Sequence, residues 1–358
     1  MRSRFAATLV ITIAAGCGTN GDIASKPIGD DVLAEECEWQ SAAEPADADV
    51  PLCDLEFREV VRLEGSVEGV APDYPVQVFR DGTYVTGTYQ RGKIAHWGPD
   101  GRFIGTLGTG PGEGPGEFDH ASDLVQASDD EFFVFTGLQL VHRYSVGDGF
   151  LRSFRLPTYG GVSGAAAYED GVVVSAFDLD GFRSIRIQGD SVEKQGVLAP
   201  PGGILLLTAT EDVGVWSAIA NRYVLRRHAW PLGAAVDSLV PDRDWFRGPE
   251  GREALLYGIQ ADSRGLIWAA GIAPTPDAPP RRRPAGVDMP VSEEDEAEAM
   301  KHTDFVIDAH TPDGRLVATV RFDTLEEAPS PMPAGLWYRR TPDELSIVIL
   351  EAVLVARR

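Results

Sequence analysis

Short apolar runs that alternate with polar residues recur along this chain in groups of four. Turns at corresponding places in successive groups contain Asp100, Asp148 and Asp190, which lie 48 and 42 residues apart. Four short strands per unit, repeated at this period, are typical of the blades of a β-propeller, in which each blade is a four-stranded antiparallel sheet. The 39 Gly and 25 Pro residues suit many short strands joined by turns. We therefore expect an all-β fold.

Five such groups are complete, and a sixth is one or two strands short. The five span residues 76–107, 122–154, 164–196, 204–239 and 259–322, and the sixth has strands at 336–340 and 345–355. A strand at 57–63 can complete the sixth group, which closes the ring by pairing the N- and C-terminal strands and removes exposed sheet edges. The sequence thus predicts a six-bladed β-propeller over residues 56–358. Two packed β-sandwiches are the competing architecture.

The first 17 residues have the pattern of an export signal. Arg2 and Arg4 precede an apolar run at 5–15 that is too short to span a membrane, and small residues lead into Cys17. Small residues followed directly by Cys resemble the lipobox of bacterial lipoproteins. The resemblance implies that signal peptide 1–16 is removed, that Cys17 is acylated, and that lipid anchors the protein in the bacterial cell envelope. An ordinary cleaved signal with a chance Cys is the alternative.

Residues 17–55 are rich in Ala, Asp and Glu and poor in large apolar residues, which indicates an acidic tether between the anchor and the folded body. Cys37 and Cys53 lie at its far end. An even pair of cysteines in an exported protein favours a disulfide, and two free thiols are the alternative.

A loop rich in Gly and Pro follows the first predicted hairpin. Asp100 and Gly101 form the turn of that hairpin, and the loop then runs from Gly110 to Phe118. Glycines permit positive φ angles, so Gly110, Gly112 and Gly116 suit a compact loop in which Glu117 accepts backbone hydrogen bonds and Phe118 returns to the core. A phosphate-binding loop is disfavoured, because neither a Gly-Lys-Ser/Thr motif nor a helix pattern follows.

On these residues the chain resembles the six-bladed, NHL-type β-propellers of bacterial exported proteins and lipoproteins. In that family a hairpin that ends in Leu-Gly before a Gly-Pro-Gly-Glu-Phe loop marks a blade junction, which corresponds here to Leu107-Gly108 and 114–118. The resemblance implies a fold rather than a reaction.

Residues 273–301 interrupt the fifth group. The first half is Pro-rich, and the second half, 291–301, has the capping and charge pattern of a short helix. We expect either a tolerated surface insertion or a lid or partner-binding segment over one face of the ring.

Composition excludes some classes of partner but does not identify the ligand or substrate. The formal net charge of −23 disfavours nucleic acid and anionic membrane surfaces as partners. One hypothesis is a monomeric, non-catalytic binding module that needs no cofactor and recognises a protein, peptide or glycan at one mouth of the ring. The alternative is a hydrolase or lyase with Ca²⁺ or another divalent cation held by carboxylates at the central channel. Three or more Asp, Glu or His side chains that converge on the ring axis would favour the second.

Overall fold

The computed structural model describes most of the chain beyond residue 35. The described residues are 36–40, 50–65, 69–136, 139–169, 171–200, 204–210, 214–229, 231–247, 254–275, 278, 301–343 and 345–357. The predicted signal peptide 1–16, Cys17 and most of the segment 273–301, including all but the last residue of its predicted helix, lie outside them. No described helix is long and apolar enough to cross a membrane.

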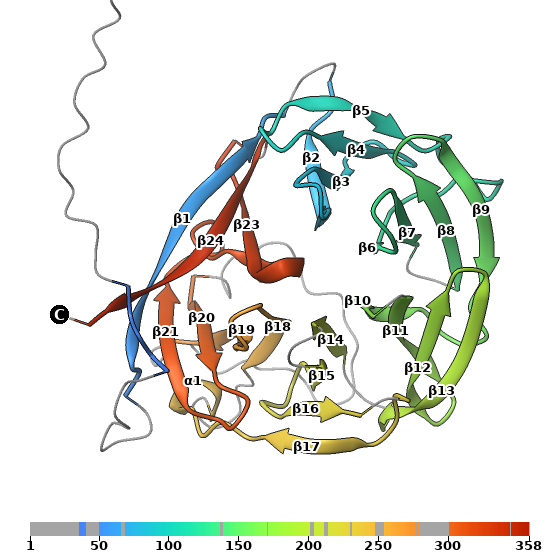
Figure 1. Cartoon of the computed structure of the whole chain (residues 1–358). Helices are drawn as coiled ribbons and strands as arrows, with labels where there is room; N and C mark the ends of the chain where they lie inside the picture. The colour runs from blue at the N-terminus through green and yellow to red at the C-terminus, as the bar shows by residue number, and fades with distance from the viewer. Residues whose placement is uncertain are drawn as a thin grey trace, which may run out of the picture. The chain divides into compact units, whose positions relative to one another are not determined.

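Six four-stranded antiparallel sheets are arranged around one axis in the unit from Glu35 to Arg358 (Figure 1). The first two blades are β2 (Pro72–Val78), β3 (Tyr84–Thr88), β4 (Ile94–Trp97) and β5 (Phe103–Leu107), then β6 (Asp123–Gln126), β7 (Glu131–Phe135), β8 (Leu140–Ser145) and β9 (Gly149–Arg155). The next two are β10 (Val162–Tyr168), β11 (Gly171–Asp178), β12 (Gly181–Gln188) and β13 (Ser191–Ala199), then β14 (Leu205–Thr210), β15 (Gly214–Ile219), β16 (Leu225–His228) and β17 (Ala235–Leu239). The fifth is β18 (Leu255–Ala261), β19 (Ile267–Pro274), β20 (Thr303–His310) and β21 (Leu316–Phe322). The predicted six-bladed propeller is confirmed.

The sixth blade is built from both ends of the chain. Its strands, from the axis outward, are β22 (Ser330–Pro331), β23 (Leu336–Arg340), β24 (Ile347–Ala356) and β1 (Cys53–Leu63). The strand β1 pairs antiparallel with β24 from Cys53↔Ala356 to Leu63↔Ile347. This pairing confirms the predicted closure of the ring, and it gives β24 a partner on its outer side.

A second N-terminal segment holds the other side of β24 near the C-terminus. Glu36 forms a β-bridge with Val355, and the Cys37 amide donates to the Leu354 carbonyl over 3.1 Å. A disulfide joins Cys37 to Cys53, the first residue of β1. The end of the chain is therefore paired on both sides by N-terminal segments that are covalently linked to each other.

The core lies between neighbouring blades. Each of the large indole side chains Trp97, Trp216, Trp268 and Trp337 is at most 1% exposed. The rings of Trp268 and Trp337 meet edge-on with centroids 5.7 Å apart, which packs the fifth blade against the sixth. Burial of such large side chains between sheets contributes strongly to the stability of the ring.

Two short helices interrupt the pattern of strands in the described residues. The helix α1 (Asp244–Arg247) lies in the connection from the fourth blade to the fifth, and the 3₁₀ turn η1 (Pro333–Gly335) joins β22 to β23. Figure 1 shows η1 on the axial side of the sixth blade.

Candidate functional site

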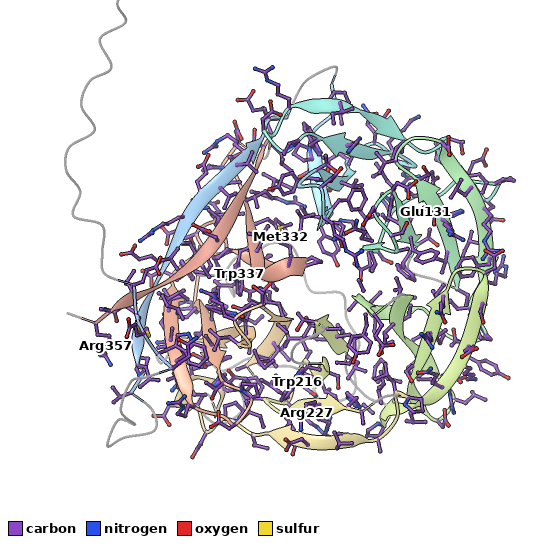
Figure 2. All side chains as sticks on the ribbon, viewed as in Figure 1. Glu131, Trp216, Arg227, Met332, Trp337 and Arg357 are labelled. Atoms are coloured by element: carbon purple, nitrogen blue, oxygen red, sulfur yellow. A yellow bond between two sulfur atoms is a disulfide. The ribbon has the colours of Figure 1, made fainter. Side chains whose placement is uncertain are left out.

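A cavity of about 370 Å³ lies beside α1, and a larger one of about 670 Å³ lies on the ring axis. The axial cavity is lined by the innermost strand of every blade: β2, β6, β10, β14, β18 and β22. Figure 2 shows Met332, one of the lining residues, on the inner side of the ring, whereas Arg357 lies at its outer edge. Because all six blades have the same strand order, their inner strands begin at the same mouth of this cavity.

Three tyrosines and one aspartate gather at the mouth where the inner strands begin. Tyr74 lies near the start of β2 and Tyr257 near the start of β18, Asp123 is the first residue of β6, and Tyr338 pairs with Ser330, the first residue of β22. All four side chains belong to the wall of the axial cavity. We call this group the tyrosine mouth.

The tyrosines of this mouth are anchored to different degrees. The Tyr257 hydroxyl donates to the Pro329 carbonyl over 3.1 Å, and Tyr338 is 9% exposed. Tyr74 is 51% exposed, so its ring is presented to solvent. Its hydroxyl is nevertheless shielded: burial raises the pKa of Tyr74, and the charges of Asp123 and then Tyr338 raise it further. Tyr74 of the first blade thus lies within electrostatic reach of Asp123 and Tyr338, and Tyr257 lies within reach of Tyr338.

Asp123 is a carboxyl group in the cavity wall whose hydrogen bonds, among the described residues, come only from backbone amides. Its Oδ1 accepts from the Leu124 amide over 2.8 Å, and its Oδ2 accepts from the Ala165 amide at the inner edge of β10 over 3.2 Å. Burial raises the pKa of Asp123 to about 7, and the two backbone hydrogen bonds oppose that rise. The pKa of this carboxyl group therefore lies far above the ordinary range of an aspartate side chain.

Within the described cavity wall, the other charged residue is Arg80, which lies just beyond the opposite end of β2. Its guanidinium pairs with Asp129 over 3.3 Å. Among the described residues no ion pair involves Asp123, and the one cation of the described wall is paired with Asp129 instead.

The third blade leaves room at the axis. Gly164, Ala165, Ala166 and Ala167 of β10 line the cavity with small side chains. Asp123 lies directly beside these small residues, since it accepts from the Ala165 amide, and the tyrosines of the first, fifth and sixth blades add aromatic surface to the wall.

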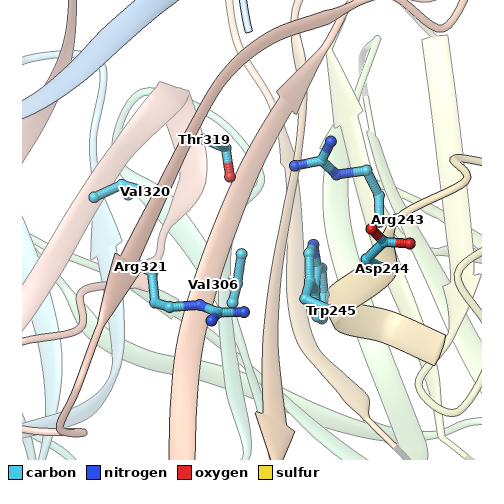
Figure 3. Close-up of a pocket in the computed structure, with 7 residues that line it drawn as sticks. All are labelled: Arg243, Asp244, Trp245, Val306, Thr319, Val320 and Arg321. Carbon is cyan, nitrogen blue, oxygen red and sulfur yellow. The ribbon is translucent and has the colours of Figure 1, made fainter. Parts of the chain in front are cut away.

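The cavity beside α1 contains a buried polar network. Figure 3 shows Arg243 and Trp245 facing Thr319 across it. The Asp308 carboxylate accepts from Arg243 Nε (3.0 Å), Trp245 Nε1 (2.9 Å), Thr319 Oγ1 (2.6 Å) and the Tyr223 hydroxyl (3.0 Å). Tyr223 belongs to the fourth blade, and Thr319 to the fifth. Arg243 and Trp245 come from the connection between them, so Asp308 ties these blades together.

His310 completes this network. Its Nε2 lies 2.9 Å from the Tyr223 hydroxyl oxygen, and the side chain is 1% exposed. Burial lowers the pKa of His310 to about 4, despite the opposing charge of Asp308. The imidazole is therefore neutral at pH 7, and the carboxylate has a full set of donors, which is the arrangement of a structural network.

The predicted blade-junction residues lie at the outer part of the first blade, away from the axial cavity. Asp100 and Gly101 form the turn between β4 and β5, where the Gly101 amide donates to the Gly98 carbonyl over 3.0 Å. Gly101 has a φ of +78°, and a Cβ there would lie 2.1 Å from the Arg62 carbonyl oxygen of β1. The turn therefore packs closely on the strand that closes the ring.

The loop that follows is held by its own residues. Phe118 donates its amide to the Gly110 carbonyl over 3.2 Å, and its side chain is 3% exposed. Glu117 Oε2 accepts from the Gly114 amide over 2.9 Å, and the Gly116 carbonyl accepts from the Tyr144 hydroxyl over 2.7 Å. Gly112 also has a positive φ. None of the residues that we predicted for this motif lines the axial cavity.

The tyrosine mouth was not predicted from the sequence. A partial signal exists for single residues: Asp123 is the second residue of the inner strand that we predicted at 122–127, and Tyr74 stands two residues before the one that we predicted at 76–79. Among the described residues, no three His, Cys, Asp or Glu side chains are grouped so as to hold a metal ion. The convergence on the axis that a carboxylate-bound cation requires is thus not seen in this part of the chain.

Comparison with known proteins identifies the fold. No protein-family model matches the chain, and no curated protein matches its sequence. Among solved structures, a member of the DUF4221 family from Bacteroides vulgatus is similar, with a TM-score of 0.60 and 9% identity over 86% of this chain and 100% of that one.

Two further structures are more distant. A streptogramin B lyase matches with a TM-score of 0.49 and 12% identity over 85% of this chain and 89% of that one. The Cps50 (Swd1) β-propeller domain of Myceliophteria thermophila has a TM-score of 0.46 and 10% identity over 78% and 96% of the two chains. Identities this low show the fold alone, and the resemblance to NHL-type families stays a prediction.

Proposed function

We propose that this protein is a binding module of the bacterial cell envelope that captures a peptide, protein segment or glycan at the tyrosine mouth, and that lipid at Cys17 tethers it to a membrane. The observation that carries the binding role is the axial cavity, whose wall combines a solvent-exposed tyrosine, an unpaired carboxylate and small residues. Its volume of about 670 Å³ falls in the range of ligand pockets in proteins.

Tyr74 provides the direct test of the binding site. In the full-length protein, Tyr74→Ala removes an exposed ring from the mouth, and we expect binding to peptide or glycan arrays to weaken about tenfold or more, since aromatic side chains dominate such contacts. Tyr159→Ala is the matched control, because Tyr159 is 71% exposed but does not line the cavity. Equal affinities of wild type and Tyr74→Ala for every array ligand would rule out this mouth as the binding site.

The tether is supported by the sequence pattern that ends at Cys17. Cys17→Ala removes the acylation site, so we expect the protein to move from the membrane fraction of an exporting bacterium to the soluble fraction. Unchanged partitioning of the variant would exclude anchoring through this cysteine.

A further inference from the structure

We propose that the tyrosine mouth selects ligands that carry an ammonium group, and that its ligand class is peptide amines: a free N-terminus or a lysine side chain. This inference rests on the proposed binding function and narrows it. It concerns the chemistry of recognition at Asp123, which no comparison assigns.

The first argument is the incomplete set of partners around Asp123. An ionised carboxylate offers about four acceptor positions. Two backbone amides, from Leu124 and Ala165, occupy one position on each oxygen. The remaining positions have no donor among the described residues, and the carboxylate lines an open cavity. A bound ammonium group, with up to three N–H donors, supplies both the missing hydrogen bonds and the missing charge.

The second argument is the contrast between Asp123 and the other charged side chains in or near the cavity wall. Arg340 pairs with Asp73 and donates to the Tyr89 hydroxyl over 2.7 Å, so that cation is already engaged. Arg80, the cation of the cavity wall, is paired with Asp129. Asp123 is thus the charged side chain of the described wall that has no ion-pair partner among the described residues. A cationic ligand can form that ion pair, and its affinity increases as a result.

The aromatic side chains favour the same ligand. Tyrosine rings attract cations through the negative potential of their faces, and the effect grows when the cation is removed from water. The hydroxyls of Tyr257 and Tyr338 are engaged with Pro329 and Ser330, which fixes these rings at the mouth. Tyr74 remains exposed and available to cover a bound group.

Charge and size disfavour acidic ligands and folded domains. The net charge of −23 attracts cations from a distance and repels acidic glycans and nucleic acid. A cavity of about 670 Å³ admits a chain end or a single side chain rather than a folded domain. An amine at the end of a peptide or of a lysine side chain satisfies both conditions.

The experiment uses a pool of lysine-containing hexapeptides, offered to the full-length protein at pH 8 before and after acetylation of all amino groups. Retained peptides are measured by equilibrium dialysis and mass spectrometry. We expect acetylation to weaken binding about tenfold or more, because it removes a charged donor to a carboxylate. Asp123→Asn should cause a similar loss for the unmodified pool, whereas Asp148→Asn, at an exposed turn remote from the cavity wall, should cause none.

Equal binding of the unmodified and acetylated pools by the wild type would overturn this inference. This comparison uses the wild-type protein alone, so it does not depend on whether a variant folds. So would retention of the unmodified pool by a folded Asp123→Asn protein at wild-type affinity, or capture of glycans alone. In each of these cases the proposed binding function would stand if Tyr74→Ala still lowered the affinity. The proposed binding function itself would be wrong if Tyr74→Ala left all binding unchanged.

Discussion

Asp123 and Asp308 are both partly or wholly buried carboxylates, and their surroundings give them different roles. Asp308 is fully buried and accepts from an arginine, a tryptophan, a threonine and a tyrosine. Asp123 accepts from two backbone amides and faces a cavity. A buried charge with every acceptor position engaged stabilises a fold, whereas one with open positions is available to a ligand.

His310 predicts a pH dependence of stability. Its pKa is about 4 in the folded state and near 6.5 when unfolded, so the unfolded chain binds more protons between these values. The stability associated with the neutral imidazole is complete above pH 6.5 and is lost as the pH falls toward 4, by up to about 3 kcal/mol.

Urea denaturation at a series of pH values measures this loss. His310→Gln should remove this contribution to the dependence of the unfolding free energy on pH between 6.5 and 4. The lowered pKa values of His96, His142 and His228 keep contributions of the same sign, and the raised pKa of Asp123 adds one of the opposite sign, so the test is the difference between variant and wild type. His120→Gln, at an exposed position, should leave the slope unchanged. The same slope in wild type and His310→Gln would contradict the account of this network.

At the scale of single elements, β24 is the strand on which the ring depends. It pairs with β23 and β1, and near its end residues 36–37 take a place beside it. Because both N-terminal segments contact the same strand, the disulfide between Cys37 and Cys53 constrains the closure of the ring.

Breaking this disulfide should loosen the closure. Closing a loop of this length stabilises a protein by roughly 3 kcal/mol in the chain-entropy model. We expect the double variant Cys37→Ser, Cys53→Ser to lose about that much unfolding free energy in urea, and the amides of β1 and β24 to exchange hydrogen faster than those of the third blade. Reduced wild type should match the variant. Equal stability of the oxidised and reduced wild type would show that the β1–β24 pairing holds without the covalent link.

At the scale of the whole molecule, the sequence predicts the ring better than it predicts the site. Alternating patterns and Asp-containing turns placed nearly every strand of the first five blades within a few residues, and the apolar alternation of 57–63 indicated the closing strand. The inner strand β22 escaped prediction because it has two residues, one of them proline, and carries no periodic pattern.

The tyrosine mouth was not predicted from the sequence for a different reason. Tyr74, Asp123, Tyr257 and Tyr338 come from four blades and are distant in sequence. Ring closure alone brings the first and sixth blades together, so no local pattern can reveal that these side chains share a mouth. The most conspicuous motif of the sequence, the loop Gly110–Phe118, instead packs its Phe118 into the core and serves the junction between blades.

The central claim is that ligand binds where the inner strands begin, and hydrogen–deuterium exchange of the full-length protein tests it most directly. With a saturating amount of the unmodified peptide pool, the account predicts slower exchange in 72–78, 123–126, 162–168 and 330–338, all of which line the axial cavity or border it. Exchange in the outer strands β9 and β17 should be unchanged. Protection confined to those outer strands, or to the cavity beside α1, would contradict the account.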